Sequence, residues 1–301
     1  KRNELEKKIS KLQYASMKFS KSRKDLAADV SKALQDELVD EHMDEESSTR
    51  RKHFERLLIS FIGEEFHPLK TVSLVEMKLV VFLHRRHRFE VETCASFSVG
   101  TGLGNIYGNK GGLVVYLQIY NTRLAFVSCH LAAHMPNLDK RNEDIFHILS
   151  ASSHHLRVDS RIPKEITVPE KVDHCFWLGD LNYRVDFDRR NGSKPSDFNE
   201  NFQRVLKLVK SKQYEQIMSA DQLKLEQHKG AVLEGFREGK YAFAPTFKVQ
   251  KGLPDSLYNK KRIPSYCDRI LWHSLPGKKQ EIRQLALFSP QIVSTSDHKP
   301  V

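Results

Sequence analysis

An acidic residue, an amide and a cation follow an apolar run in the middle of the chain. The run Cys175–Leu178 predicts a short buried strand, and it ends in Gly179. Asp180, Asn182 and Arg184 come next at alternate positions. A carboxylate beside an amide and a cation at a strand end can hold a metal ion, a water molecule or a phosphate. A strand, a glycine turn and a capping aspartate explain the same residues, so this stretch alone leaves both interpretations open.

A glycine-rich segment, Gly108–Gly112, precedes a predicted strand. Its glycines let backbone N–H groups approach an anion, and Lys110 beside Asn109 adds a positive charge. The segment lacks the spacing of a P-loop that binds ATP. A glycine hairpin with an exposed lysine is the alternative interpretation.

Two histidines follow another apolar run, residues 124–127. His130 can contact a phosphate, or it can be a satisfied histidine of the core. His134 lies four residues further on, but no third ligand at a suitable spacing supports a zinc site.

Carboxylates also occur in two short segments near the end of the chain. Asp268 comes directly before the predicted strand 269–273, and Asp297 and His298 follow a polar turn. A histidine after a turn can contact a phosphate, and a second carboxylate can orient its imidazole and raise its pKa. Neither segment is specific by itself, because the chain holds 14 histidines.

In combination and in this order, these segments resemble the inositol polyphosphate 5-phosphatase family of the exonuclease–endonuclease–phosphatase superfamily. The resemblance extends from about residue 66 to the last residue. WLGDLNYR together with CDRIL is typical of this branch rather than of the nucleases of the superfamily. The motifs are GNKGG (108–112), SCHLAAH (128–134) followed by Arg141 and Asn142, WLGDLNYR (177–184), PTFK (245–248), KKRIPSYCDRILW (260–272) and SDHKPV (296–301).

The resemblance implies one cleft in which Mg²⁺ polarises a 5-phosphate and water attacks the phosphorus in line. Asp180 would be the base for that water, and Asn182 would hold the water or the transition state. His298 would contact the scissile phosphate, with Asp268 orienting its ring. His130 would bind a phosphate oxygen.

The metal site departs most from the family pattern. Asp297 would lie near the ion. The family begins with a strand carrying Thr-Trp-Asn and then a Gln-Glu segment whose Glu binds magnesium, but no Trp precedes Trp177 here. Glu37 is the candidate metal ligand of this chain. Its segment continues a helical spacing of leucines and valine over residues 26–38, so an exposed acid on a helix is the alternative.

The substrate contacts implied by the resemblance are mostly cationic, as several phosphates on an inositol ring require. Phe247 stands where the family usually has Tyr, which removes one hydroxyl. The implied substrate-binding residues are Asn109, Lys110, Arg141, Asn142, Tyr183, Arg184, Lys248, Lys260 and Arg262.

The composition favours an anionic partner. The 301 residues include 49 Lys and Arg against 38 Asp and Glu, a formal charge of +11. This excess suits phosphorylated small molecules, an anionic membrane or nucleic acid. We find no transmembrane span or signal peptide, and the four separated cysteines fit free thiols in a reducing compartment. We therefore expect a cytoplasmic protein peripheral to membranes, and the missing initiator Met suggests a fragment.

Two regions of the chain differ in pattern. Residues 1–62 are charged with helical apolar spacing, which predicts a helical N-terminal segment. Residues 63–301 predict a sheet-centred α/β catalytic domain with helices outside. The resemblance implies two packed, mainly antiparallel mixed β-sheets flanked by helices, a four-layer α/β sandwich like that of DNase I. The predicted strands are 79–83, 89–99, 113–119, 124–129, 175–178, 269–273 and 282–288, and the predicted helices are 140–157, 198–210 and 221–228.

The leading hypothesis is a magnesium-dependent phosphatase. It would remove the 5-phosphate from phosphoinositides, such as PI(4,5)P2 and PI(3,4,5)P3, or from soluble inositol polyphosphates. A phosphoinositide-binding pseudophosphatase with an incomplete metal site is the alternative. A nuclease on the same scaffold fits the net charge, but the GNKGG and KKRIP segments argue against it, and we expect no nucleic-acid partner.

Overall fold

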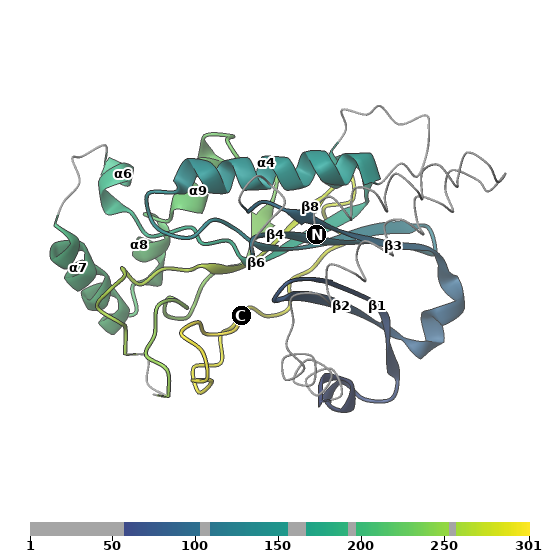
Figure 1. Cartoon of the computed structure of the whole chain (residues 1–301), viewed down its shortest axis with the longest axis horizontal. Helices are drawn as coiled ribbons and strands as arrows, with labels where there is room; N and C mark the ends of the chain where they lie inside the picture. The colour runs from purple at the N-terminus through teal and green to yellow at the C-terminus, as the bar shows by residue number, and fades with distance from the viewer. Residues whose placement is uncertain (1–56, 103–108, 156–166, 192–196, 253–256) are drawn as a thin grey trace, which may run out of the picture. The chain divides into compact units, whose positions relative to one another are not determined.

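The computed structural model describes residues 57–102, 109–155, 167–191, 197–252 and 257–301 (Figure 1). The chain divides into two compact units, residues 1–64 and 65–301. In the first unit, residues 57–62 are helical. Glu37 lies outside the described residues, and so do the predicted helical spacing around it and Gly108 of the glycine-rich segment. The predicted domain boundary after residue 62 stays a prediction.

A six-stranded mixed sheet, in the order β3-β4-β5-β6-β8-β7, is the centre of the second unit. All neighbours in this sheet are antiparallel except β5 and β6, whose parallel pairing requires a long crossover through helix α4. Its strands are β3 (Val91–Gly100), β4 (Gly111–Ile119), β5 (Thr122–His130), β6 (His174–Asp180), β7 (Arg237–Glu238) and β8 (Asp268–Ser274).

A second, two-stranded antiparallel sheet packs against β4. It consists of β1 (Phe66–Leu74) and β2 (Met77–His84), and the 3-10 helix η1 (Arg85–Glu90) follows it. Buried residues of β1 and β2, among them Leu79 and Val81, form one hydrophobic cluster with Leu113 and Val115 of β4. Two packed sheets flanked by helices confirm the predicted α/β fold class.

Helix α4 (Leu138–His155) covers the other face of the larger sheet (Figure 1). Ile145 and Ile148 of this helix share a hydrophobic cluster with Val114 and Tyr116 of β4. Val114 and Tyr116 alternate along β4 with Leu113 and Val115, which face β1 and β2. Successive side chains of a strand point to opposite faces of the sheet. Strand β4 is therefore buried on both faces, which explains its nearly continuous apolar sequence.

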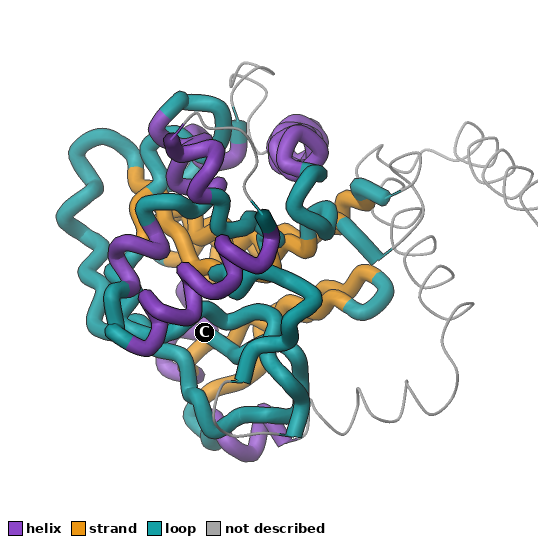
Figure 2. The backbone as a smooth tube through the Cα atoms, turned by 90° about the vertical axis from the view of Figure 1, so that its left-hand side faces the viewer, coloured by secondary structure: helices purple, strands orange, loops and turns teal. Residues whose placement is uncertain are grey.

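The helices that follow β6 lie at the end of the sheet where this strand stops (Figure 1 and Figure 2). Figure 2 views this end directly and shows helices and loops in front of the strands. Asp221 caps the last helix, because its carboxylate accepts a hydrogen bond from the backbone N–H of Lys224. None of the described helices is long and apolar enough to cross a membrane. The helices are α5 (Val168–Lys171), which precedes β6, and α6 (Phe187–Asn191), α7 (Phe198–Lys210), α8 (Tyr214–Met218) and α9 (Gln222–His228), which follow it.

The strand predicted at residues 282–288 is wrong. These residues are described, and they form no strand. Leu285 and Phe288 are 83% and 68% exposed, and Leu287 packs against a hydrophobic cluster, so the run contributes only part of its apolar side chains to a core. Strand β7 pairs with β8 at the edge of the sheet. An apolar run becomes a stable strand only when a partner backbone and a core are both available to it.

Gly179 determines how closely β5 and β6 approach at their ends. Its φ of +121° is a conformation that residues with side chains rarely adopt. A Cβ atom at this position would lie 2.1 Å from the carbonyl oxygen of Cys129. The same register that pairs Gly179 with Cys129 pairs Asp180 with His130. The glycine therefore controls the distance between two of the predicted site residues.

We expect Gly179→Ala to lower the free energy of unfolding by about 2–4 kcal/mol, through backbone strain and the clash with Cys129. Gly230→Ala is the matched control, because Gly230 also has a positive φ of +68° but has no atom within 4 Å of the new Cβ. Its cost should be only about 1–2 kcal/mol. Urea unfolding of both variants makes the comparison, and equal losses would contradict the role of the close approach.

Candidate active site

Neighbouring strands of the larger sheet bring the predicted polar residues together at one edge. The register pairs Gly111 with His130, His130 with Asp180, and Asp180 with Asp268. Lys110 comes directly before β4 at the same edge. Residues from four separate motifs thus form one row, which follows from the strand register and not from any spacing along the chain.

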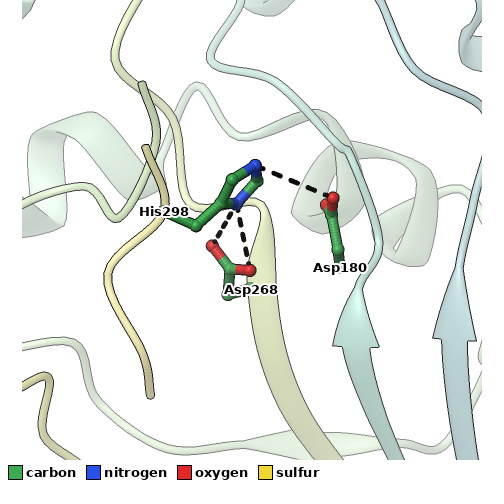
Figure 3. Close-up of side chains that lie close together, drawn as sticks. All are labelled: Asp180, Asp268 and His298. Atoms are coloured by element: carbon green, nitrogen blue, oxygen red, sulfur yellow. Dashed lines mark hydrogen bonds and ion pairs between the residues drawn. The ribbon is translucent and has the colours of Figure 1, made fainter. Parts of the chain in front are cut away.

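His298 enters from the C-terminal segment and lies between two carboxylates (Figure 3). Its Nδ1 is 3.0 Å from Oδ2 and 3.2 Å from Oδ1 of Asp268. Its Nε2 faces Oδ2 of Asp180 at 3.9 Å. The ring of Phe247 packs against the imidazole with 4.5 Å between centroids. Asp268 and Phe247 together fix the orientation of the His298 ring.

The charges of the site favour opposite protonation states for His298 and Asp180. Burial lowers the pKa of His298, but the hydrogen bond with Asp268 and the negative charges of Asp268 and Asp180 outweigh it, so the pKa lies above its ordinary value. Burial raises the pKa of Asp180, but the hydrogen bond with His130 and the charge of His298 outweigh it, so that pKa lies below its ordinary value. These interactions therefore favour an imidazolium at His298 and a carboxylate at Asp180.

Asn182 is held against Asp180 by several hydrogen bonds. Its backbone N–H donates to Oδ1 of Asp180 at 3.0 Å, and its Nδ2 donates to Oδ2 at 3.1 Å. The same Nδ2 donates to the carbonyl oxygen of Leu131 at 3.1 Å. The backbone adopts a left-handed φ of +55°, a conformation that asparagine tolerates better than most residues. Asn182 thus fixes both oxygens of the carboxylate.

Arg184 supports Asn182 from behind. Its Nε donates to the carbonyl oxygen of Asn182 at 3.0 Å, and a terminal nitrogen donates to the Asn182 side-chain oxygen. Its guanidinium stacks on Phe247 at 4.3 Å from the ring centroid, and the residue is only 5% exposed. Two nitrogens of Arg184 are thus used inside the protein, and its contact with substrate stays a prediction.

Lys110 and His130 lie beside Asp180. The Nε2 atom of His130 is 2.8 Å from Nζ of Lys110 and 3.3 Å from Oδ2 of Asp180. Because one ring nitrogen cannot accept and donate at once, it bonds either to the lysine or to the carboxylate. Burial lowers the pKa of Lys110, against the opposing charge of Asp180. Asn109 is exposed and accepts a hydrogen bond from Lys110 at 3.4 Å.

Three predicted substrate-binding residues build the wall behind the site. Arg141 is completely buried and donates to the carbonyl oxygens of residues 132, 134 and 135 and to Gln222. Asn142 accepts from the hydroxyl of Tyr183 at 2.7 Å and donates to Glu226 at 2.8 Å. Tyr183 is also completely buried. Arg141 thus holds the loop after β5 to helix α9, and Asn142 connects Tyr183 to the same helix. Their contact with substrate stays a prediction.

Three further predicted cations remain accessible. Lys248 is half-buried and forms an ion pair of 2.6 Å with Asp297. Lys260 and Arg262 are exposed, and Arg262 contacts His134 at 3.3 Å. Burial raises the pKa of Asp297, but the hydrogen bond and the charge of Lys248 outweigh it and keep that pKa low. The structure pairs Asp297 with Lys248, and its position near a metal ion stays a prediction.

The described residues that could hold a metal ion are Asp180, Asp268 and His298, whose ligand atoms lie within 4.8 Å of one another. Each carboxylate has about four lone-pair sites. Asp268 uses three on His298 and Thr246, and Asp180 uses two on Asn182 and a third when His130 donates to it. Each therefore keeps at least one oxygen position free. Two such carboxylates fit a hard divalent cation that also binds substrate phosphates and water.

Thr246 of the PTFK motif is a site residue for which the sequence alone predicts no role. Its hydroxyl donates a hydrogen bond of 2.7 Å to Oδ2 of Asp268. The backbone of Phe247, the next residue, bridges both Ser265 and His298. The PTFK segment therefore lies between the motifs that contain Ser265 and His298. The sequence indicates this position only through the occurrence of PTFK together with those motifs.

The sequence of the chain matches a known protein family. The model of the Endonuclease/Exonuclease/phosphatase family 2 matches residues 4–301. The chain belongs to this family. The described motifs of the site all lie within the residues that the family model matches, so the match includes the site.

The relatives of this family 2 chain include inositol phosphate phosphatases. The mouse (Mus musculus) type II inositol 1,4,5-trisphosphate 5-phosphatase is 34% identical over 247 residues, which is 80% of this chain and 23% of that protein. The human (Homo sapiens) phosphatidylinositol 3,4,5-trisphosphate 5-phosphatase 2 is 31% identical, over 79% of this chain and 18% of that protein. The chain thus spans less than a quarter of the length of these curated relatives.

Two solved structures share the fold of this family 2 chain. The inositol polyphosphate 5-phosphatase domain of SPsynaptojanin, in complex with inositol (1,4)-bisphosphate and calcium ion, matches with a TM-score of 0.64 at 24% identity, over 83% of this chain and 65% of that one. The ferrous NO complex of Cimex nitrophorin matches with a TM-score of 0.59 at 21% identity, over 84% of this chain and 77% of that one. Proteins with different chemistries therefore share this fold, so the function of this chain has to be inferred from the residues of its site.

We expect Asp268→Asn to lower the pKa of His298 towards its ordinary value, because the variant loses the charge and weakens the hydrogen bond at Nδ1. The raised pKa of wild-type His298 contributes stability that is complete below the unfolded pKa, about 6.5, and disappears as the pH rises through the folded value. An NMR titration of the His298 imidazole in metal-free protein measures both pKa values.

Asp297→Asn is the control for this titration. Asp297 raises the pKa of His298 only through its charge and less strongly than Asp268 does. Its removal should therefore lower the pKa of His298 by a smaller amount. A larger fall in the Asp297 variant than in the Asp268 variant would show that the hydrogen bond at Nδ1 is not the main influence.

Proposed function

We propose that this chain hydrolyses the 5-phosphate of phosphoinositides or of soluble inositol polyphosphates with Mg²⁺. One observation carries the proposal: His298 lies between Asp268 and Asp180, with Lys110 and His130 beside them on the same sheet edge. Phosphoryl transfer needs cations around the phosphate and an oriented water molecule, and this arrangement supplies both. The named relatives that act on inositol 5-phosphates support the choice of substrate class.

In the proposed reaction, Asp180 would orient the attacking water and accept its proton. Its lowered pKa keeps it ionised, and Asn182 holds both of its oxygens. Protonated His298 would donate a hydrogen bond from Nε2 to a phosphate oxygen, while Asp268 holds Nδ1. Lys110 would neutralise charge that develops on the phosphate. Each group is preorganised by partners within the protein, so little reorganisation is needed at the moment of reaction.

Asp180 and Asp268 are the described carboxylates that would hold Mg²⁺. When bound, the ion would supply Lewis-acid polarisation of the phosphate. Glu37 stays a prediction for a further ligand. The cations that stay accessible at this end, Lys248, Lys260 and Arg262, would bind the other phosphates of the headgroup. Lipid substrates would bring the protein to a membrane surface from the cytoplasm as a peripheral protein, and we propose no nucleic-acid partner.

A binding protein without turnover is the second candidate. It is favoured by the small number of free oxygen positions, since Asp180 and Asp268 each use most of their lone pairs to accept hydrogen bonds from protein groups. In that case the cations would still hold a headgroup. Calorimetry that detects Ins(1,4,5)P3 binding, combined with no phosphate release in Mg²⁺, would establish this second function.

We expect the purified chain to release phosphate from Ins(1,4,5)P3 in the presence of Mg²⁺, and chelation of the ion to stop the reaction. Ins(1,3,4)P3, which has no 5-phosphate, should give none. Asp180→Asn should lower kcat about 100- to 1000-fold, because it removes the charge that orients and deprotonates the water. Asp139→Asn on the exposed first turn of α4 is the matched control and should leave kcat unchanged. Undiminished turnover in the Asp180 variant would rule out the proposed base.

We expect Arg184→Lys to lower kcat about 10- to 100-fold with little change in KM, since a lysine cannot hold the carbonyl and side-chain oxygens of Asn182 at once. Steady-state kinetics with Ins(1,4,5)P3 separates the two constants. Arg262→Lys, an exposed arginine-to-lysine change in a predicted headgroup contact, should act mainly on KM. A rise in KM without a fall in kcat for Arg184→Lys would instead mean that Arg184 binds substrate.

A further inference from the structure

A cavity of about 620 Å³ lies between helices α8 and α9 and the segment after β7, outside the site described above. Its volume is in the range of small-molecule pockets. Met218 of α8, Leu225 of α9 and the ring of Tyr241 form apolar parts of its wall. None of the residues that line it belongs to the predicted catalytic or substrate-binding set. The cavity is therefore a second place where a ligand could bind.

Two lysines, Lys224 and Lys240, line this cavity, against the single carboxylate of Glu215. Lys240 and Glu215 form an exposed ion pair of 2.5 Å, and both residues also line an adjoining cavity of about 430 Å³. An exposed pair of this kind is weakly held, so another carboxylate or phosphate can replace Glu215 at Lys240. Apolar walls with an exchangeable cation at the rim suit an amphipathic anion with one hydrocarbon chain.

The wall of the cavity contacts a buried ion network. The hydroxyl of Tyr241 donates to Glu238 at 2.7 Å and accepts from Arg269 at 3.1 Å. Lys224 pairs with the same Glu238 at 2.8 Å. Arg269 is bound to Glu238 by two hydrogen bonds of 2.7 Å and to Asp221 by one of 2.8 Å, and the side chains of all three are completely buried. A buried charge tolerates little loss of its partners, so the position of Arg269 follows that of Tyr241 and Glu238.

This network is adjacent to the catalytic end of β8. Arg269 directly follows Asp268, which holds Nδ1 of His298. Tyr241 also packs edge-on against Tyr266 at 4.9 Å between centroids, two residues before Asp268. Because successive residues of a strand point to opposite faces, β8 presents Asp268 to the site and Arg269 to the network. A ligand that displaced Tyr241 would therefore act on the strand that carries Asp268.

The geometry points to a binding site for a single-chain amphipathic anion, a hydrocarbon with a carboxylate or phosphate head, in the cavity between α8 and α9. The ligand's chain contacts Met218, Leu225 and Tyr241, and its head pairs with Lys240. Occupation of this site alters the orientation of His298 through Tyr241 and Arg269. Binding is independent of the proposed phosphatase function, and only the consequence for turnover rests on it.

Isothermal titration calorimetry with dodecanoate, at concentrations below micelle formation, tests binding to the full chain. We expect one saturable site. Leu225→Trp, which fills the cavity, should weaken binding about tenfold or more, because most of the buried hydrocarbon area is lost. Phe146→Trp adds the same side chain on the exposed face of α4 and should leave binding unchanged. Equal binding to both variants, or no binding to the wild type, would overturn the proposal.

Two charge variants test the position of the head. Lys240→Gln should weaken dodecanoate binding about threefold, and Glu215→Gln, which frees Lys240, should strengthen it by a similar factor. Both side chains are more than two-thirds exposed, so neither change endangers the fold. Dodecyl phosphate should follow the same pattern, whereas neutral dodecyl maltoside should bind more weakly and show no dependence on Lys240. Equal binding of the neutral compound would overturn the choice of an anion.

The coupling to the catalytic residues is measured on His298 itself. Dodecanoate should shift the imidazole resonances of His298 in the wild type and in Phe146→Trp but not in Leu225→Trp. This readout needs no turnover, so an inactive enzyme that binds dodecanoate and shows the shift would refute the proposed function while supporting the site. Binding without any shift of His298 would overturn the coupling.

Discussion

The hydrogen-bonded register of β5, β6 and β8 places His130, Asp180 and Asp268 side by side at one sheet edge. Strands in a sheet are less than about 5 Å apart. The register therefore holds the carboxylates of Asp180 and Asp268 closer together than two unpaired acids on a protein surface would lie. Gly179 makes the parallel approach of β5 and β6 possible by lacking a Cβ atom. Every other feature of the site compensates for, or uses, this juxtaposition.

Groups between and around Asp180 and Asp268 offset the repulsion between these two negative charges. His298 occupies the position between them, and its raised pKa means that the carboxylates favour a positive imidazolium there. Asn182 and Thr246 donate hydrogen bonds to the remaining oxygens. Hydrogen bonds to charged groups are stronger than those between neutral ones, so this arrangement is rigid. The same interactions favour the ionised form of Asp180 and the protonated form of His298, which are the states that the proposed function requires.

Local sequence patterns could predict the strands and helices of the core but not their partners. The apolar runs at β4, β5, β6 and β8 indicated strands, and the bounds of α7 were predicted correctly. The run at 282–288 has the same local pattern but is not a strand, because pairing depends on which backbone lies beside it. The hydrogen bond from Thr246 to Asp268 was equally invisible, since no periodicity connects two loops that meet only in the fold.

Two arginines that were predicted to contact substrate have hydrogen-bond partners inside the protein. Arg141 and Arg184 have several donors in a fixed plane, and both use them to hold backbone carbonyls and side-chain oxygens inside the protein. A motif match identifies that an arginine is needed but cannot tell whether its donors point to substrate or to a loop. Among the other predicted cations, Lys260 and Arg262 are exposed and Lys248 is paired with Asp297. In the proposed function, the preorganised residues around His298 would hold the phosphate that reacts, and recognition of the other phosphates would depend on these accessible side chains.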